Sequence, residues 1–191
     1  MSETGNHSIP LKVRSRALDK ELERRSCYTA ADAKQFVLFA LRCIQEPREE
    51  GVWPIPFCLM FLNPVLYNGV KLVDKWLAGE GVSIEQLQEA DRLAYKAARE
   101  EAGIDNPNKL TGPQAIFWAA AKLVRAAMAA ATAAAASERA FLSAFYARWL
   151  ARQAANYARR TGQRLNHEAI DLQERLLSEI LPPEPSSQQE P

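Results

Sequence analysis

The stretch Arg125-Ala-Ala-Met-Ala-Ala-Ala-Thr-Ala-Ala-Ala-Ala-Ser137 decides the fold of this chain. It is the centre of a longer segment, Ala115 to Ala158, in which close to half of the residues are alanine. Alanine is the best helix former, because it loses no side-chain entropy in a helix. Its small side chain also allows neighbouring helices to approach closely. The segment therefore predicts helices that pack tightly against other helices.

An unbroken helix from Thr111 to Arg160 would be ~70 Å long at 1.5 Å per residue, too long for an ordinary domain of this size. Ser137 followed by Glu138 offers a helix N-cap. We therefore predict two helices that meet near residues 132–137. The first is almost free of charge and is expected to be buried scaffold. The second carries arginines and aromatic residues and is expected to hold the working surface.

The rest of the chain shows helical start and stop signals and almost no alternation of period two. Ser83-Ile-Glu-Gln86 is a capping box, and Val82 and Leu87 are positioned as a hydrophobic staple. Asn63 can cap a helix that has Pro64 in its first turn. These signals predict an all-α fold, a single compact bundle of about six or seven helices without a sheet.

Composition divides the chain into three parts. Residues 1–15 are predicted to be a flexible N-terminal arm, residues 16–181 a helical domain and residues 182–191 a disordered tail. The N-terminus lacks the apolar core of a signal peptide, and no apolar window approaches the ~20 residues that a membrane span needs. We expect a cytoplasmic protein without a membrane partner.

The inventory of catalytic and metal-binding residues is small. The chain has two histidines, His7 in the predicted arm and His167 in the first turn of the last predicted helix. Its three cysteines are widely spaced and form no Cys-x-x-Cys pair. No phosphate-binding loop or nucleophile motif is present. We therefore expect no cofactor and no metal, and a protein that is not an enzyme.

The clearest local asymmetry is basic. No acidic residue lies between Glu138 and Glu168, and on a helical wheel Arg148, Arg152 and Arg159 fall within about 40° of one another. Such a stripe can bind an acidic protein, pair with the acidic predicted helix that begins at Ser83, or simply be solvated. A net charge of +1 argues against nucleic acid as the partner.

Trp53 lies in a proline-rich loop, and an exposed tryptophan there would be a natural hot spot for a protein partner. Together with Arg148, Arg152 and Arg159, it makes up the predicted partner-binding set.

Several segments resemble a known class of proteins. These are Trp76-Leu-Ala-Gly79, Val82-Ser-Ile-Glu-Gln-Leu87, the alanine tracts and the terminal helix Ile170 to Ile180. Together, over roughly residues 36–180, they resemble all-helical, alanine-rich bacterial proteins that are grouped with immunity proteins of polymorphic toxin systems. The resemblance implies a helical fold and a protein partner. It implies no catalytic residues.

The sequence favours a non-enzymatic, immunity-like interaction module that binds a protein through a helical face. Two alternatives stay open: an enzyme or small-ligand binder with a pocket near Trp76, Trp118 and Tyr95, and a nucleic-acid-associated helical protein. Homo-oligomerisation is also open, because helix faces of small residues pack well against copies of themselves.

Overall fold

The computed structural model describes residues 10–24, 30–45, 59–60, 62–103, 112–132, 141–146 and 164–180. Nearly all of these residues are helical and none belongs to a strand, so the predicted all-α fold is confirmed. The helices are α1 (Leu11–Arg24), α2 (Ala30–Gln45), α4 (Pro64–Ala78), α5 (Ile84–Ala102), α6 (Gly112–Ala131) and α8 (Arg164–Ile180). Residues 59, 60, 62 and 141–146 are helical as well.

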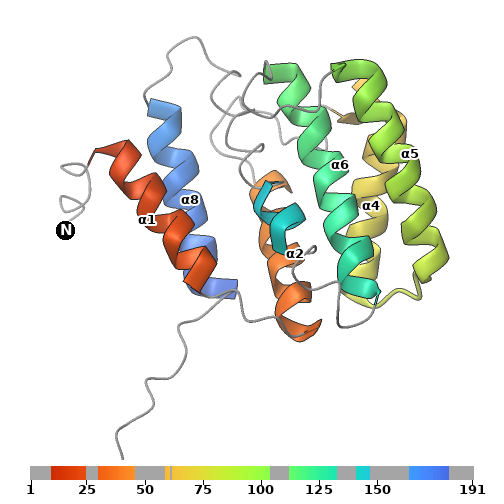
Figure 1. Ribbon diagram of the computed structural model, residues 1–191, viewed down its shortest axis with the longest axis horizontal. Coiled ribbons are helices and arrows are strands. Elements are labelled where there is room, and N and C mark those ends of the chain that lie inside the picture. Colours follow the sequence, from red (N-terminus) through yellow and green to blue (C-terminus); the bar gives the residue numbers. More distant parts are fainter. Residues whose placement is uncertain are drawn as a thin grey trace, which may run out of the picture.

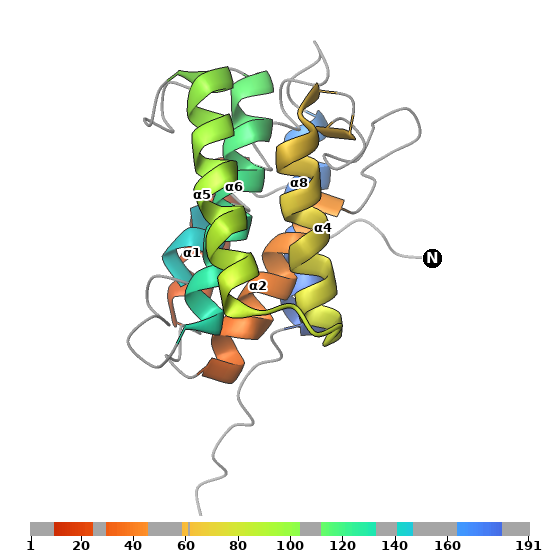
Figure 2. The ribbon, with the colours of Figure 1, turned by 90° about the vertical axis from the view of Figure 1, so that its right-hand side faces the viewer.

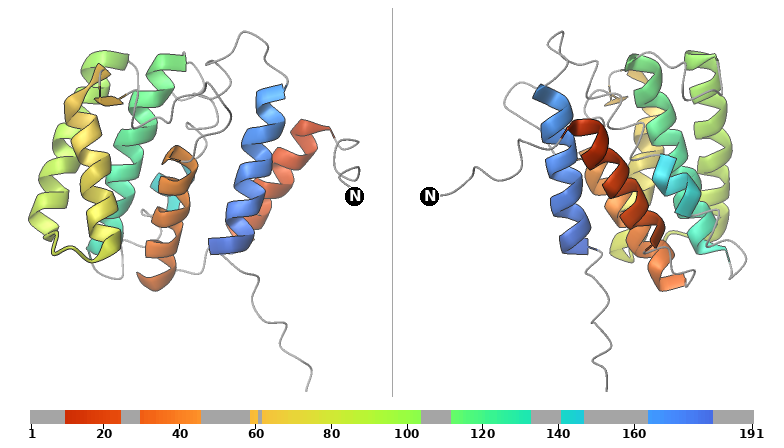
Figure 3. Two further views of the ribbon diagram at one scale, coloured as in Figure 1. Left: turned by 180° about the vertical axis from the view of Figure 1, so that it is seen from behind. Right: turned by 60° about the vertical axis from the view of Figure 1, so that its left-hand side comes forward.

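The helices form a bundle in which α6 takes a central place (Figure 1). It contacts α2 on one side and both α4 and α5 on the other. On the far side of α2 lies α8, which in turn contacts α1 (Figure 3). The outer faces of α4 and α5 therefore form one edge of the bundle and α1 forms the other.

Helix α6 is buried along almost its whole length. From Ala115 to Ala129 no side chain is classed as exposed. Its alanines make this possible, because they allow three neighbouring helices to approach the α6 backbone. The prediction that the first half of the alanine tract is buried is confirmed for residues 115–129.

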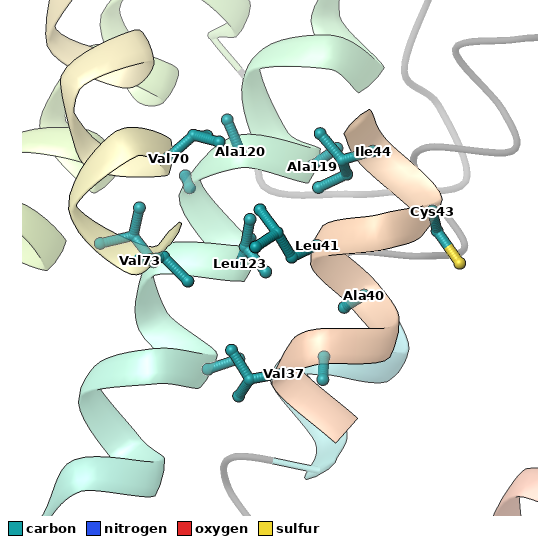
Figure 4. Packing of buried hydrophobic residues seen from close by; sticks show 14 of the residues in the cluster. Val37, Ala40, Leu41, Cys43, Ile44, Val70, Val73, Ala119, Ala120 and Leu123 are labelled. Atoms are coloured by element: carbon teal, nitrogen blue, oxygen red, sulfur yellow. The ribbon is translucent and has the colours of Figure 1, made fainter. Parts of the chain in front are cut away.

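The core between α2, α4 and α6 consists of aliphatic side chains (Figure 4). Two valines of α4 point towards α6, and the facing surface of α2 contributes larger aliphatic residues. The residues shown there include Val37, Leu41 and Ile44 of α2, Val70 and Val73 of α4, and Ala119 and Leu123 of α6, each at most 1% exposed. Burial of each such side chain stabilises the fold by about 1.5–3 kcal/mol.

Gly69 lets α4 come close to α6. A Cβ atom at this position would lie 2.9 Å from Val124 Cγ2 and 3.9 Å from Ala94 Cβ. The first distance is shorter than ordinary van der Waals contact, so a larger residue at this position requires Val124 or one of the two helices to shift.

The α4–α5 hairpin begins and turns as its caps predict. The Asn63 side chain accepts a hydrogen bond from the Leu66 amide at 3.1 Å, and Pro64 is the first residue of α4. Gly79 ends α4 in the left-handed region with φ 78°, which glycine adopts without strain.

The capping box of α5 is also formed. Ser83 Oγ accepts from the Gln86 amide at 3.2 Å, and Gln86 Oε1 accepts from the Ser83 amide at 2.8 Å. Gly103 closes α5 with φ 73°. Both N-caps agree with the sequence prediction.

Helix α6 ends within the alanine tract. Thr132 follows its last residue in a bend, and the Thr132 hydroxyl donates back to the Met128 carbonyl at 3.1 Å. Residues 141–146 then lie beside α2 (Figure 1), where the Phe141 ring packs edge-on to Phe36 with centroids 4.9 Å apart. The chain thus leaves the α6 helix before residue 137, as predicted.

One predicted boundary is wrong. Helix α1 begins at Leu11, inside the segment 1–15 that was predicted to be a flexible arm. In this helix Arg14, only 4% exposed, donates from Nη2 to Asp171 Oδ1 and Glu174 Oε2 of α8, each at 2.5 Å, and Leu18 and Leu22 are buried in the core. Residues 1–9 and 182–191 lie outside the described residues.

Candidate functional site

The four residues predicted to bind a partner lie outside the part of the chain that the structure describes. They are Trp53, Arg148, Arg152 and Arg159. Their role as a contact surface stays a prediction.

Of the three residues predicted to surround a pocket, two are in direct contact with each other. Tyr95 and Trp118 pack edge-on with ring centroids 5.2 Å apart, but Trp118 is only 2% exposed and fills the core. Trp76 instead lies beneath the ammonium group of Lys34, which is 5.5 Å from its ring centroid. The cavity described below has none of the three in its lining.

Two cations of α6 stack on these aromatic rings. The guanidinium of Arg125 lies 4.1 Å from the Tyr95 centroid. Lys122 Nζ lies 5.6 Å from the Trp118 centroid and 6.0 Å from that of Tyr146. Each distance is within the range at which a cation is attracted to an aromatic face. These contacts join α5, α6 and residues 141–146.

The same cluster contains an ion pair between neighbouring helices. Asp91 of α5 is 9% exposed, and its Oδ1 accepts from Arg125 Nε at 3.1 Å. Arg125 Nη2 also donates to Asp91 Oδ2 at 3.3 Å. A carboxylate this well buried needs such a partner, because desolvation without one is costly. The pair is structural: it fixes α5 against α6.

A groove of about 530 Å³ runs between α4 and α5. Figure 2 looks onto these two helices, which lie side by side and are joined by residues 79–83. Its lining comes from one face of each helix, namely Val65, Asn68, Gly69 and Leu72 of α4, and Glu85, Gln86, Glu89, Ala90 and Leu93 of α5. The spacing is that of a single helix face in both cases.

The groove exposes large apolar side chains. Val65 is 42% exposed and Leu93 is 37% exposed. Because α4 and α5 are antiparallel neighbours, both residues lie at the end of the groove away from the connection, and Leu72 lies nearer to the connection. Leu62 and Met60, just before α4, are exposed as well. Val65 and Leu93 therefore leave apolar surface of the groove open to solvent.

The α5 side of the groove is acidic. The pKa of Glu85 lies below its usual range, because its carboxylate accepts hydrogen bonds from its own amide and from Ser83 in the first turn of α5. The pKa of Glu89 is lowered by Arg92, whose Nη2 donates to Glu89 Oε1 at 2.6 Å. Both carboxylates are therefore ionised at neutral pH, and no Lys or Arg is among the lining residues.

Sequence reasoning missed both the groove and the buried carboxylate. The sequence indicated only that the helix beginning at Ser83 is acidic; Glu85 and Glu89 are exposed on that helix, whereas Asp91 is buried. The signal was present: Asp91 continues the stripe of Leu87, Ala94 and Ala98, all of them buried. No local sequence pattern predicts the groove, because the groove forms only when α4 and α5 lie side by side.

Within the described ranges, no three His, Cys, Asp or Glu residues cluster closely enough to hold a metal ion. None of the described helices combines the length and the apolarity that crossing a membrane requires. Comparison of the chain with models of protein families, with curated proteins and with solved structures found no match.

Proposed function

We propose that this protein is a non-enzymatic interaction module that binds a protein partner through the outer face of α4 and α5. The observation that carries the proposal is the α4–α5 groove, an apolar surface that the bundle itself leaves open, with Val65 and Leu93 exposed at one end. Proteins commonly use such grooves to bind an amphipathic helix, whose apolar residues enter the groove at helical spacing.

The mode of action that we propose is steric blocking or scaffolding, as the resemblance to immunity proteins implies. A rigid bundle suits this role. The central helix α6 is packed on α2, α4 and α5, so the two walls of the groove are held at a fixed separation. A pre-formed surface of this kind binds without a large ordering cost. Arg148, Arg152, Arg159 and Trp53 are retained as a second predicted contact, for an acidic region of a partner.

A small-molecule site is the second candidate. The groove volume of about 530 Å³ falls within the ~300–1,000 Å³ typical of ligand pockets, and its lining is mostly apolar with a few polar groups. It is shallow and open along two helices, however, and Val65 and Leu93 keep much of their surface in water. A protein segment would cover this surface more completely than a small molecule would.

The test is affinity capture from the native host with matched variants. Leu93→Glu places a charge at the exposed end of the groove, and Val13→Glu makes the same change at an exposed position of α1 on the other edge of the bundle. Partners that bind in the groove are expected to be lost with Leu93→Glu and kept with Val13→Glu. If both variants capture the same proteins as the wild type, the groove is not the binding surface.

The arginine stripe is tested separately. Charge reversal of Arg148, Arg152 and Arg159 is expected to weaken the capture of an acidic partner and to leave a groove-dependent partner unchanged. If the triple reversal leaves every detected interaction intact, the stripe has no role in binding.

A further inference from the structure

We infer that the segment which occupies the α4–α5 groove is a basic amphipathic helix of a protein partner, with apolar residues at helical spacing and Lys or Arg along one flank. This inference rests on the proposed function and specifies the chemistry of the partner. It follows from the length of the groove, from its apolar residues and from the sign of the charges beside them.

The length of the groove matches about two helical turns. Val65 and Leu72 mark the two ends of its α4 wall and are seven residues apart, or ~10 Å along the helix. An occupying helix of that length presents apolar residues at positions i, i+3 or i+4, and i+7 on one face. The exposed side chains of Val65 and Leu93 at one end provide the first contact, and Ala90 and Leu72 extend the apolar surface towards the other.

The negative charge of the groove favours basic residues along one flank of the occupying helix. Glu85 and Glu89 line the same wall four residues apart, and neither Lys nor Arg contributes to the lining. Arg92 engages Glu89, but the pair is exposed and lies on a single helix, so it holds Glu89 only weakly in water. A helix with two basic residues four positions apart can pair with both carboxylates while its apolar face covers the groove.

The same charges disfavour two other occupants. An acidic helix would bring its carboxylates up to Glu85 and Glu89. A second copy of this chain, docked groove to groove, would bring four carboxylates of the same two positions to one interface. Like charges opposed in this way cost binding energy and select against the wrong partner.

The probes for the test are three fluorescent peptides of about 20 residues, long enough for measurable helicity. The first combines Leu at amphipathic spacing with Ala and Lys, and the second replaces each Lys by Glu. The third has the composition of the first but no apolar periodicity. Each is titrated with the full-length chain, and binding is followed by fluorescence anisotropy.

The basic amphipathic peptide is expected to bind at least about tenfold more tightly than either of the others. Glu85→Gln combined with Glu89→Gln is expected to remove most of the difference between the basic and the acidic peptide. The matched control is Glu100→Gln combined with Glu101→Gln, which makes the same charge change on α5 outside the groove, and it is expected to leave the difference intact. Leu93→Ser is expected to weaken binding of the basic peptide.

Four outcomes would overturn the inference. The acidic peptide binds as well as the basic one, the non-periodic basic peptide binds equally well, none of the three binds, or the wild type is a dimer that Leu93→Ser dissociates. If none of the peptides binds while affinity capture still depends on Leu93, the occupant differs and the proposed function stands. If capture does not depend on Leu93, the proposed function itself fails.

Discussion

Asp91 is a charged residue in a buried stripe of α5, where its neighbours on the same face are leucine and alanine. Its position is explained by one residue of another helix, since Arg125 donates to both of its carboxylate oxygens. Arg125 is in turn held over the Tyr95 ring. The three side chains form a unit in which each restricts the next.

Asp91→Asn is expected to destabilise the protein by about 1–3 kcal/mol, because Arg125 would keep its charge at a partly buried site without an ionised partner. Chemical denaturation followed by circular dichroism measures the change. Glu89→Gln removes one partner of an exposed ion pair on the same helix and is the control, for which a much smaller change is expected. Equal effects of the two substitutions would show that the burial of Asp91 contributes nothing.

Gly69→Ala tests the close approach of α4 to α6. The added methyl group would lie 2.9 Å from Val124 Cγ2, and the expected loss is about 1–2 kcal/mol, since overpacking outweighs the ~1 kcal/mol that alanine gains over glycine in a helix. The same substitution in a Val124→Ala background is expected to be neutral or stabilising. If Gly69→Ala costs the same in both backgrounds, Val124 is not the residue that requires glycine.

At the residue scale, the sequence predicted the residues whose hydrogen bonds stay within one turn of their own helix. It did not predict the residues that pair with a side chain of another helix. Asn63 and Ser83 bond to amides three residues away, so their role was visible in the local pattern. The Asp91–Arg125 pair spans 34 positions. Only the packing of α5 on α6 brings these two residues together.

Among the elements, α1 joins the bundle through the buried Leu18 and Leu22 and through one buried cation. Its link to the bundle passes through α8, where the Arg14 guanidinium bonds to Asp171 and Glu174, and these hydrogen bonds raise the pKa of Arg14 above its usual value. The two carboxylates lie one turn apart on α8 and repel each other when no cation separates them.

Arg14→Met is expected to loosen α1 from α8 at a cost of about 1–3 kcal/mol, while the packing of α4, α5 and α6 stays intact. Hydrogen–deuterium exchange should then increase in α1 and α8 but not in α6. Arg16→Met, at an exposed position of the same helix, is the control and should change neither. Uniformly faster exchange over the whole bundle after Arg14→Met would contradict this local role.

The same contact explains why one element was placed wrongly. The N-terminal residues of α1 carry little apolar pattern, and composition alone predicted a flexible arm up to residue 15. The carboxylates that stabilise α1 lie more than 150 positions further on. The start of α4 and that of α5, by contrast, were predicted correctly, because their capping signals are contiguous with the helices they begin.

At the scale of the whole molecule, the bundle is asymmetric. Helix α6 is enclosed by α2, α4 and α5, whereas the outer face of α4 and α5 has no further described helix in front of it (Figure 2). The sequence placed the working surface in the second half of the alanine-rich segment. It could not indicate the groove, since Val65 and Leu93 are each an ordinary exposed residue on their own helix and line one groove only because α4 and α5 pack together.

The most direct test of the central claim is photocrosslinking in the native host, with a benzophenone amino acid in place of Leu93. The account predicts that the amino acid at position 93 forms a discrete covalent adduct with a protein partner. The same amino acid in place of the exposed Val13 on α1 is expected to form no adduct with that partner. Sequencing of the adduct should identify a partner segment with amphipathic, basic character. Absence of an adduct at Leu93, or the same adducts from both positions, would contradict the claim that the α4–α5 groove is the binding surface.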